Sequence, residues 1–172
     1  MQQSEFASAI RNVKLPGFAW PEPDDAGDLR IIKNVVDVGC HIIAVEKTVG
    51  HAQFAYSIGL YLNYLQPEVV IVGMDHLEAG RAINRIAARF RRGEALAAGP
   101  AFEGLHETKP LRFQELTMQR HSEELGFAIW FYCSRSSGLR FPVYQAIWPD
   151  QLGRFPDDPN CNKKAVEAQV LR

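Results

Sequence analysis

The sequence has few of the features that would place it in a membrane, disulfide-rich or nucleic-acid-binding class. No apolar run among its 172 residues reaches the roughly 18 residues that a membrane-spanning helix needs. Its three cysteines, Cys40, Cys133 and Cys161, form no CxxC pair, and an odd number argues against a disulfide framework. With 19 Lys and Arg against 20 Asp and Glu, the net charge of −1 gives no reason to expect nucleic acid or an anionic membrane as a partner.

The sequence also lacks export signals and the short motifs of common cofactor sites. The N-terminal stretch MQQSEFASAIRNVKLPG has no charged-then-apolar pattern of a secretion signal, so we expect a cytoplasmic protein. Neither GxGxxG nor a P-loop occurs, and no two histidines have the HxH or HxxxH spacing that brings metal ligands together. We therefore predict no metal site from local spacing.

What the sequence does contain is a hydrophobic fraction of 47%, which is typical of a globular protein. We predict one domain over residues 26–172, preceded by an N-terminal arm over residues 1–25. The arm holds a short predicted helix, Glu5–Val13, and a proline-rich loop in which Phe18 and Trp20 are expected to pack on the domain. An arm that binds a partner is the alternative.

Residues 41–74 predict three consecutive strands, and the rest of the chain is organised around them. The segment His41–Lys47 is rich in β-branched residues, and Gln53–Leu60 alternates around aromatic residues. The short apolar run Val69–Val72 suits a strand that is buried on both faces. Residues 48–51 are few enough to join the first two strands as a hairpin.

Helix signals lie on both sides of these strands. Asp24 and Asp25 precede a helical apolar pattern that ends at Gly39. Asp75 opens a second predicted helix, and Glu78 stands at the spacing of a capping box.

The second half of the chain is expected to alternate between strands and helices. We predict a short strand near Leu96, a strand over residues 111–117, a helix whose first turn is residues 122–124, a strand over residues 142–148 and a short helix in the polar tail. The predicted fold class is α+β, with a largely antiparallel, split-barrel-like sheet and about three helices.

Four segments in a fixed order resemble a known family. GCHIIAVEK, FAYSIGLY, QPEVVIVGM and VYQAIWPDQLGRFPDDPNC resemble the pattern of the bacterial family catalogued as domain of unknown function 4262, over residues 38–161. The chain departs from that pattern at Cys40, where an aromatic residue is common, and at Gln66, where histidine is common. If that histidine takes part in catalysis in the family, its absence here argues against an enzyme. The resemblance implies no agreed activity.

The first candidate site is a pocket near the central strands, with His41, Tyr56, Ser57 and Glu68 as ligand-binding residues. Ser57 also lies in a sequence one residue away from the GxSxG nucleophile elbow of hydrolases. Its triad partners would be Asp75 or Asp150 with His106 or His121. Too few residues follow Gly59 for the helix that such an elbow begins, so a serine on the polar face of a strand is the competing interpretation. His41 is likewise expected to be a packed residue bonded to backbone.

The second candidate site is an arginine row on the helix after Asp75. Arg81, Arg85 and Arg89, with Arg92, recur at three- and four-residue spacing and therefore share one helix face. They are candidates for holding an anion such as a phosphate or for binding an acidic partner, and a solvated face is the simpler interpretation. The order of elements is similar to that of small FMN-binding split barrels, so FMN is a candidate cofactor by fold analogy alone.

Three classes of function stay open. The leading hypothesis is a small-ligand-binding or accessory domain with a pocket near the central strands. The second is a small enzyme, either an FMN-type oxidoreductase or a hydrolase. The third is a protein-interaction module of immunity or antitoxin type that uses Trp20 and the arginine row.

Overall fold

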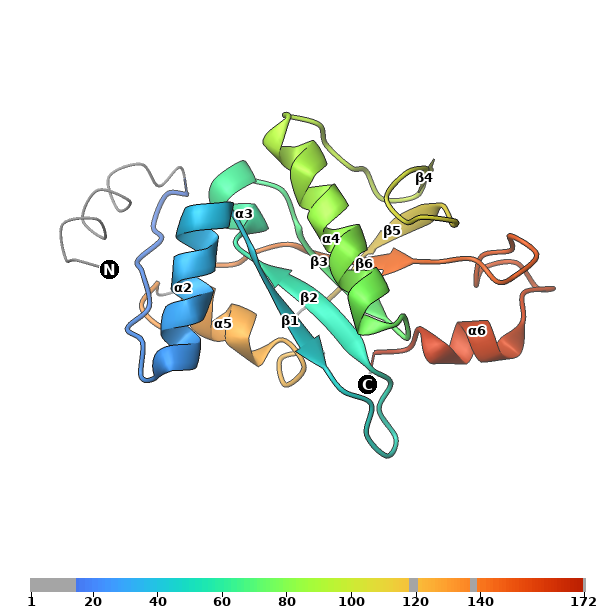
Figure 1. The fold of residues 1–172 in the computed structure, drawn as a ribbon, viewed down its shortest axis with the longest axis horizontal. Helices are drawn as coiled ribbons and strands as arrows, with labels where there is room; N and C mark the ends of the chain where they lie inside the picture. Colours follow the sequence, from blue (N-terminus) through green and yellow to red (C-terminus); the bar gives the residue numbers. More distant parts are fainter. Residues whose placement is uncertain (1–14, 118–120, 137–138, 172) are drawn as a thin grey trace.

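The computed structural model describes residues 15–117, 121–136 and 139–171, so the predicted helix Glu5–Val13 lies outside the described part. This part is an α+β fold with one six-stranded sheet and five helices (Figure 1). The strands are β1 (His41–Val45), β2 (Phe54–Ile58), β3 (Glu68–Val72), β4 (Ala101–Phe102), β5 (Leu111–Glu115) and β6 (Val143–Ile147). The helices are α2 (Ala26–Val38), α3 (Leu60–Tyr64), α4 (His76–Arg91), α5 (Gly126–Cys133) and α6 (Lys163–Ala168).

The sheet consists of two antiparallel units that meet at one parallel pair. The strand order is β1-β2-β3-β6-β5-β4, and every neighbouring pair is antiparallel except β3 with β6. The prediction of a largely antiparallel sheet is therefore confirmed. The sheet is open, with β1 and β4 as its edges, and the split-barrel form is not confirmed.

The three strands predicted in residues 41–74 are confirmed. β1 and β2 form an antiparallel hairpin in which His41 lies opposite Ile58 and Val45 lies opposite Phe54. β2 and β3 are buried at every position, as expected for strands that are covered on both faces.

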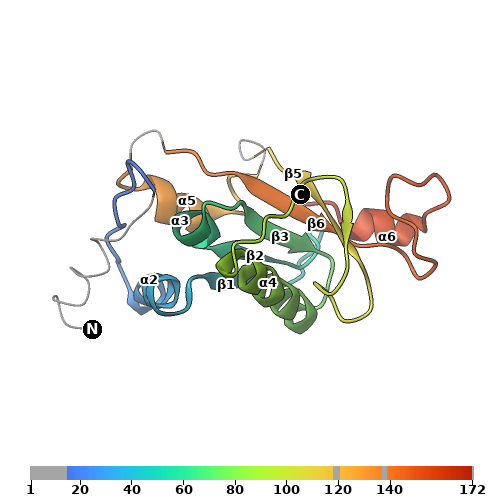
Figure 2. The same ribbon diagram turned by 90° about the horizontal axis from the view of Figure 1, so that it is seen from above.

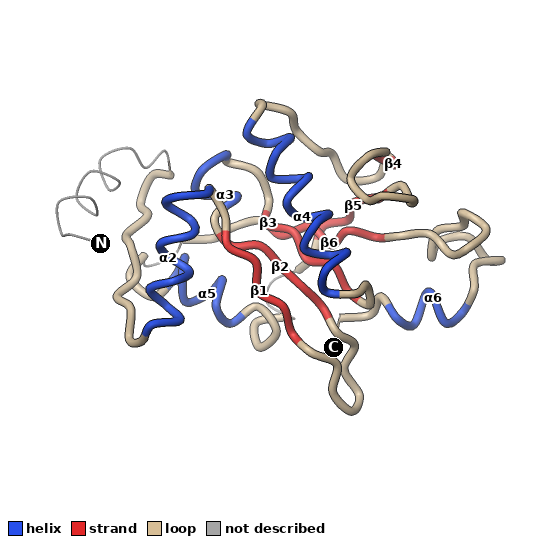
Figure 3. Tube along the Cα trace, viewed as in Figure 1, coloured by secondary structure: helices blue, strands red, loops and turns tan. Residues whose placement is uncertain are grey.

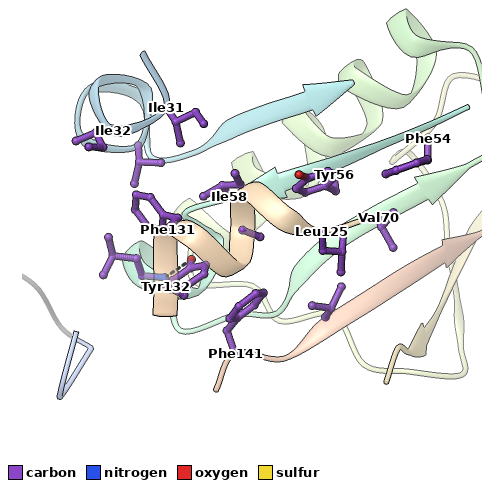
Figure 4. Close-up of a cluster of buried hydrophobic side chains, with 14 of the residues drawn as sticks. Ile31, Ile32, Phe54, Tyr56, Ile58, Val70, Leu125, Phe131, Tyr132 and Phe141 are labelled. Carbon is purple, nitrogen blue, oxygen red and sulfur yellow. Dashed lines mark hydrogen bonds between the residues drawn. The ribbon is translucent and has the colours of Figure 1, made fainter. Parts of the chain in front are cut away.

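Helices cover both faces of the sheet, and each face has its own apolar core (Figure 2). On one face α4 packs through Ile83 and Ile86 against Ile71 of β3. On the other face α2 and α5 pack against β2 and β3, and Figure 4 shows Phe131 and Tyr132 of α5 in this second core. The central strands thus alternate their side chains between two cores, because successive residues of a strand point to opposite faces.

The ends of the two long helices lie where the sequence signals predicted. Asp25 caps α2 by accepting hydrogen bonds from the backbone of Gly27 and Asp28, and Gly39 ends it in the left-handed conformation. Asp75 caps α4 by accepting from the Leu77 backbone at 2.9 Å.

The Glu78 side chain does not complete the predicted capping box at the start of α4. Its carboxylate lies 3.9 Å from His106 of the following loop.

Three predicted details are wrong. Leu96 is buried in the core beneath α4 without pairing to a strand, and the short strand of this region is β4. Residues 122–124 form a turn, and α5 begins only at Gly126. The described part has five helices instead of about three, partly because a turn at Gly59 allows the five-residue α3 to bury Leu60 and Leu62.

Long loops separate the later elements (Figure 3). The chain from α4 to β5 and from β6 to α6 is mostly loop, and α6 lies beyond the end of the sheet (Figure 1). No helix in the described ranges is long and apolar enough to cross a membrane. Before α2, Phe18 and Trp20 pack on Phe131 of α5, with ring centroids 5.5 and 5.8 Å apart.

Gly59 provides a test of the turn from β2 into α3. It has a φ of 110°, and a Cβ there would lie 2.8 Å from the Val35 side chain and 3.1 Å from the Gly39 carbonyl oxygen. Gly50 also has a positive φ, but a Cβ there meets no atom within 4 Å. We expect Gly59→Ala to lower the free energy of unfolding by about 1–3 kcal/mol more than Gly50→Ala, because only the former adds a clash. Urea unfolding of both variants measures this difference, and equal losses would contradict the clash.

Candidate functional site

The carboxyl group of Glu68 belongs to the most enclosed acidic residue among those that the structure describes. Glu68 opens β3 and is 1% exposed. Its Oε2 accepts a hydrogen bond from the Ser57 hydroxyl at 2.5 Å, and its Oε1 accepts from the backbone N–H of Gly59 at 2.8 Å and of Tyr61 at 3.0 Å. The Tyr132 hydroxyl also donates to Oε1. Four donors from β2, the following turn, α3 and α5 therefore meet at one side chain.

The hydroxyl groups of Ser57 and Tyr132 each donate a hydrogen bond to Glu68 and accept another from the backbone. The Ser57 oxygen accepts from the Val69 backbone at 2.9 Å, and the Tyr132 oxygen accepts from the Leu62 backbone at 3.2 Å. Both side chains are fully buried. We call Ser57, Glu68 and Tyr132 the carboxylate network.

Burial and hydrogen bonding act in opposite directions on this network. Burial raises the pKa of Glu68, while the hydrogen bonds from Ser57, Tyr132 and the backbone lower it. Burial and the adjacent Glu68 carboxylate raise the pKa of Tyr132 well above its usual value. Tyr132 therefore remains a neutral hydrogen-bond donor.

The arrangement around Ser57 does not form a nucleophile elbow. An elbow places its serine on a strained turn, exposed at the top of the sheet. Ser57 lies within β2, is 0% exposed and donates to a carboxylate. A short helix does follow the strand, although the sequence predicted none, but the turn residue is Gly59.

The proposed triad partners are engaged elsewhere. His106 accepts a hydrogen bond from the Thr108 backbone, and Asp150 organises its own loop by accepting from the backbone of Leu152, Arg154 and Asn162. His121 lies near Glu124 in the turn before α5, and Asp75 caps α4. The described residues therefore assemble no hydrolase triad around Ser57.

Of the four predicted pocket residues, only Ser57 and Glu68 are in contact through their side chains. His41 lies on the edge strand, and its Nδ1 is 2.8 Å from the side-chain nitrogen of Asn34, so the expected partner from the backbone is replaced by a side chain. Burial, and secondly Arg30, lower the pKa of His41. Tyr56 points into the core on the α5 side of the sheet (Figure 4).

Tyr56 lies instead at the base of a groove of about 610 Å³, which we call the aromatic groove. The groove runs between the β1–β2 hairpin, the beginning of α2 and the beginning of α5. Burial raises the pKa of Tyr56 to about 12. The apolar lining of the groove consists of Ile43, Val45, Phe54, Tyr56, Phe127 and Trp130.

The rim of the aromatic groove is acidic. Thr48 and His51 of the hairpin also line it. Among the lining residues that the structure describes, none is Lys or Arg. The carboxylates are Asp24, Asp28, Glu46, Glu123 and Glu124.

Sequence reasoning missed the α5 side of this groove. The spacing predicts a helical face of Leu125, Ala128, Ile129 and Tyr132, and all but Ile129 are buried. The segment GFAIWFYC is apolar on all sides, so this spacing did not show that Phe127 stays open. Phe127 is 48% exposed despite its size. The sequence did contain one signal of this groove wall: a helix that is apolar on every side cannot bury all of its aromatic residues.

The arginine row faces a neighbouring loop. Arg81 and Arg85 lie 3.6 and 3.4 Å from the carboxylate of Glu107, and Arg89 donates to the Glu103 carbonyl oxygen at 2.6 Å. Arg92 pairs with Glu94 at 2.9 Å. The loop after α4 thus supplies internal partners for the row, and its predicted role in anion binding stays a prediction.

The described ranges contain no group of three or more His, Cys, Asp and Glu side chains placed to hold a metal ion. Cys40, Cys133 and Cys161 are free thiols. Burial raises the pKa of Cys40 to about 11, so this thiol is protonated at neutral pH.

Tyr132→Phe tests the carboxylate network. The variant removes a donor to Glu68 and leaves the Leu62 backbone N–H without its acceptor, which costs about 1–3 kcal/mol for a buried group. Tyr144→Phe is the matched control, because its ring packs on Phe113 and its hydroxyl has no hydrogen-bond partner within the described ranges. We expect thermal or urea unfolding to show a loss for Tyr132→Phe and nearly none for Tyr144→Phe. Equal losses would refute the network's contribution.

The lowered pKa of His106 predicts that the free energy of unfolding falls in mild acid. Its side chain is 7% exposed, and burial lowers its pKa, although the nearby Glu78 opposes the shift. The unfolded chain therefore takes up the proton first as the pH falls below about 6.5, so the free energy of unfolding decreases from there toward the lowered pKa of the folded state. We expect His106→Asn to reduce this slope between pH 7.5 and pH 5.5 in urea titrations, and an unchanged slope would contradict the assignment. His41, whose pKa is also lowered, adds to the remaining slope.

Comparison with known proteins identifies the family but no activity. The model of the family described as Domain of unknown function (DUF4262) matches residues 34–162, which include all six strands, the carboxylate network and much of the aromatic groove. No curated protein and no solved structure matches the chain. The chain thus belongs to the DUF4262 family.

Proposed function

We propose that the chain is a ligand-binding domain that holds a small organic molecule in the aromatic groove. The proposal rests on the volume of the groove together with the residues that line it. A groove of about 610 Å³ falls within the range of roughly 300–1,000 Å³ that is common for small-molecule sites. Four of its side chains are aromatic: Phe54, Tyr56, Phe127 and Trp130.

The way these aromatic side chains are held supports binding over simple core packing. Phe54 and Tyr56 are stacked on rigid β2, with ring centroids 6.1 Å apart, so they form a firm base. Phe127 and Trp130 lie one helical turn apart on α5 and form the opposite wall. A nearly half-exposed Phe127 leaves apolar surface in water, and a ligand with an apolar body would cover it.

The four predicted pocket residues have different roles in this proposal. Tyr56 would contact the ligand directly. Ser57 and Glu68 would act as positioning residues, because Ser57 donates to Glu68, and Glu68 accepts from Tyr132 of the helix that carries Phe127 and Trp130. His41 is not among the lining residues of the groove and has no part in the proposal. A cytoplasmic location remains part of the prediction from sequence.

The enzyme alternatives gain less support. A hydrolase would need a reachable nucleophile, and Ser57 is enclosed. The phosphate of FMN would face five carboxylates in the aromatic groove. A protein-interaction role for the arginine row would require a partner to displace Glu107 and Glu94.

Gly126→Leu tests the proposal by filling the groove. Gly126 lines it, and a Cβ added there meets nothing within 4 Å, so the change adds volume without backbone strain. Gly80→Leu is the matched control, since Gly80 lies within α4, has equally open space and is outside the groove. The neutral probe N-phenyl-1-naphthylamine, which fluoresces in apolar sites, serves as ligand.

We expect saturable binding of this probe with a dissociation constant on the order of 10 µM, or about 7 kcal/mol. Gly126→Leu should weaken binding at least about tenfold, and Gly80→Leu should leave it unchanged. Absence of saturable binding to the unmodified chain, or equal binding by both variants, would refute the proposed function.

A further inference from the structure

We infer that the aromatic groove selects an organic cation, an amine or quaternary ammonium group attached to an apolar body. This inference rests on the proposed function and adds the charge of the ligand to it. It is drawn from three independent features of the groove: the sign of its rim, the lack of Lys or Arg partners for that rim within the described ranges, and the chemistry of its aromatic walls.

The charge of the rim is of one sign, whereas the charges of the whole chain nearly balance. The chain has 19 Lys and Arg against 20 Asp and Glu, so a surface of this size should show both signs. The aromatic groove is lined by five carboxylates, and no Lys or Arg of the described ranges lines it. These carboxylates come from three places that are distant in sequence: the beginning of α2, the β1–β2 hairpin and the turn before α5.

Several carboxylates outside the groove are paired with arginine, whereas within the described ranges none of the five in the groove has such a partner. Ion pairs join arginines to acidic residues at Glu22, Glu94, Glu107, Asp150 and Asp157. Within the groove, and within the described ranges, the only ion-pair contacts are with histidine. Glu46 lies 3.3 Å from His76, and Glu124 lies 3.9 Å from His121.

Asp28 is the clearest case of an unneutralised carboxylate. Its residue is 9% exposed, and its Oδ2 accepts a hydrogen bond from the Asp24 backbone at 3.0 Å. No Lys or Arg in the described ranges lies within ion-pair distance of it. A largely buried carboxylate without a counter-ion is costly, and a bound cation would supply the missing charge.

The aromatic walls favour the same sign of ligand. The face of an aromatic ring is the negative part of its quadrupole, and Trp attracts cations most strongly, followed by Tyr and Phe. Trp130, Tyr56, Phe54 and Phe127 all line the groove. An ammonium group is therefore attracted by rings and carboxylates together, and its apolar substituents cover Phe127. The volume of the groove, about 610 Å³, suits a small molecule better than an extended basic segment of a protein.

A matched series of naphthalene compounds tests the charge preference. The compounds 2-naphthylmethylamine, 2-naphthylmethanol and 2-naphthoate share one apolar body and are cationic, neutral and anionic at pH 7. Each displaces bound N-phenyl-1-naphthylamine, and the fall in fluorescence gives its affinity. We expect the amine to bind at least about tenfold more tightly than the alcohol in 20 mM salt, and the naphthoate to bind most weakly. In 500 mM salt the difference should narrow, because screening shortens the range of the rim's attraction.

Variants of the rim separate charge from shape. Glu124→Gln, and Asp28→Asn combined with it, should weaken binding of the amine several-fold while leaving the alcohol unchanged. Asp28→Asn keeps an oxygen that can accept from the Asp24 backbone, and Glu124→Gln alone keeps the test valid if the double variant does not fold. Asp157→Asn, which removes a carboxylate outside the groove, is the control.

The possible outcomes distinguish failure of the cation inference from failure of the proposed function. Equal affinities for the amine and the alcohol would overturn the cation inference and leave the ligand-binding proposal in place. Failure of all three compounds and of the fluorescent probe to bind would overturn both. Binding of an arginine-rich peptide with no binding of the amine would overturn a small-molecule occupant in favour of a protein segment.

Discussion

A single buried carboxylate sets the geometry on which the rest of this structure depends. A carboxyl group inside a protein is tolerated only when hydrogen bonds replace the water it has lost. Glu68 obtains four donors, and each comes from a different local element: β2, the turn at Gly59, α3 and α5. Any shift of one element would leave a buried polar group unsatisfied in another. The network therefore adds specific hydrogen bonds to the apolar contacts that hold α5 against β2.

The aromatic groove is a consequence of that constraint. Tyr132 ties the last turn of α5 to the carboxylate, and the opposite end of the same short helix carries Phe127. Phe54 and Tyr56 belong to the strand that also supplies Ser57. The two walls of the groove are thus joined through the buried residues Ser57, Glu68 and Tyr132.

Sequence reasoning was most successful where local signals and tertiary packing agree. The strands in residues 41–74 and helices α2 and α4 have clear periodicity, capping residues and terminal glycines, and all lie close to where they were predicted. It was less successful at α5, because a helix that is apolar on all sides does not show which large side chain stays exposed, and Phe127 was missed. The same limit applies to the site. Ser57 and Glu68 do meet, because neighbouring antiparallel strands bring their ends together, but the contributions of α5 and of the loop carboxylates come from distant segments whose packing no local pattern encodes.

The parallel pairing of β3 with β6 has a consequence for how the chain folds during synthesis. The two strands are adjacent in the sheet, but β3 ends at Val72 and β6 begins only at Val143. Contacts between segments so far apart form slowly, because a long loop must close before they contribute. During synthesis the apolar EVVIV strand therefore emerges with one edge unpaired, and it stays so until the C-terminal half arrives. We expect the nascent chain to be most prone to aggregation in that interval, and a chaperone that shields this edge would act before residue 143 leaves the ribosome.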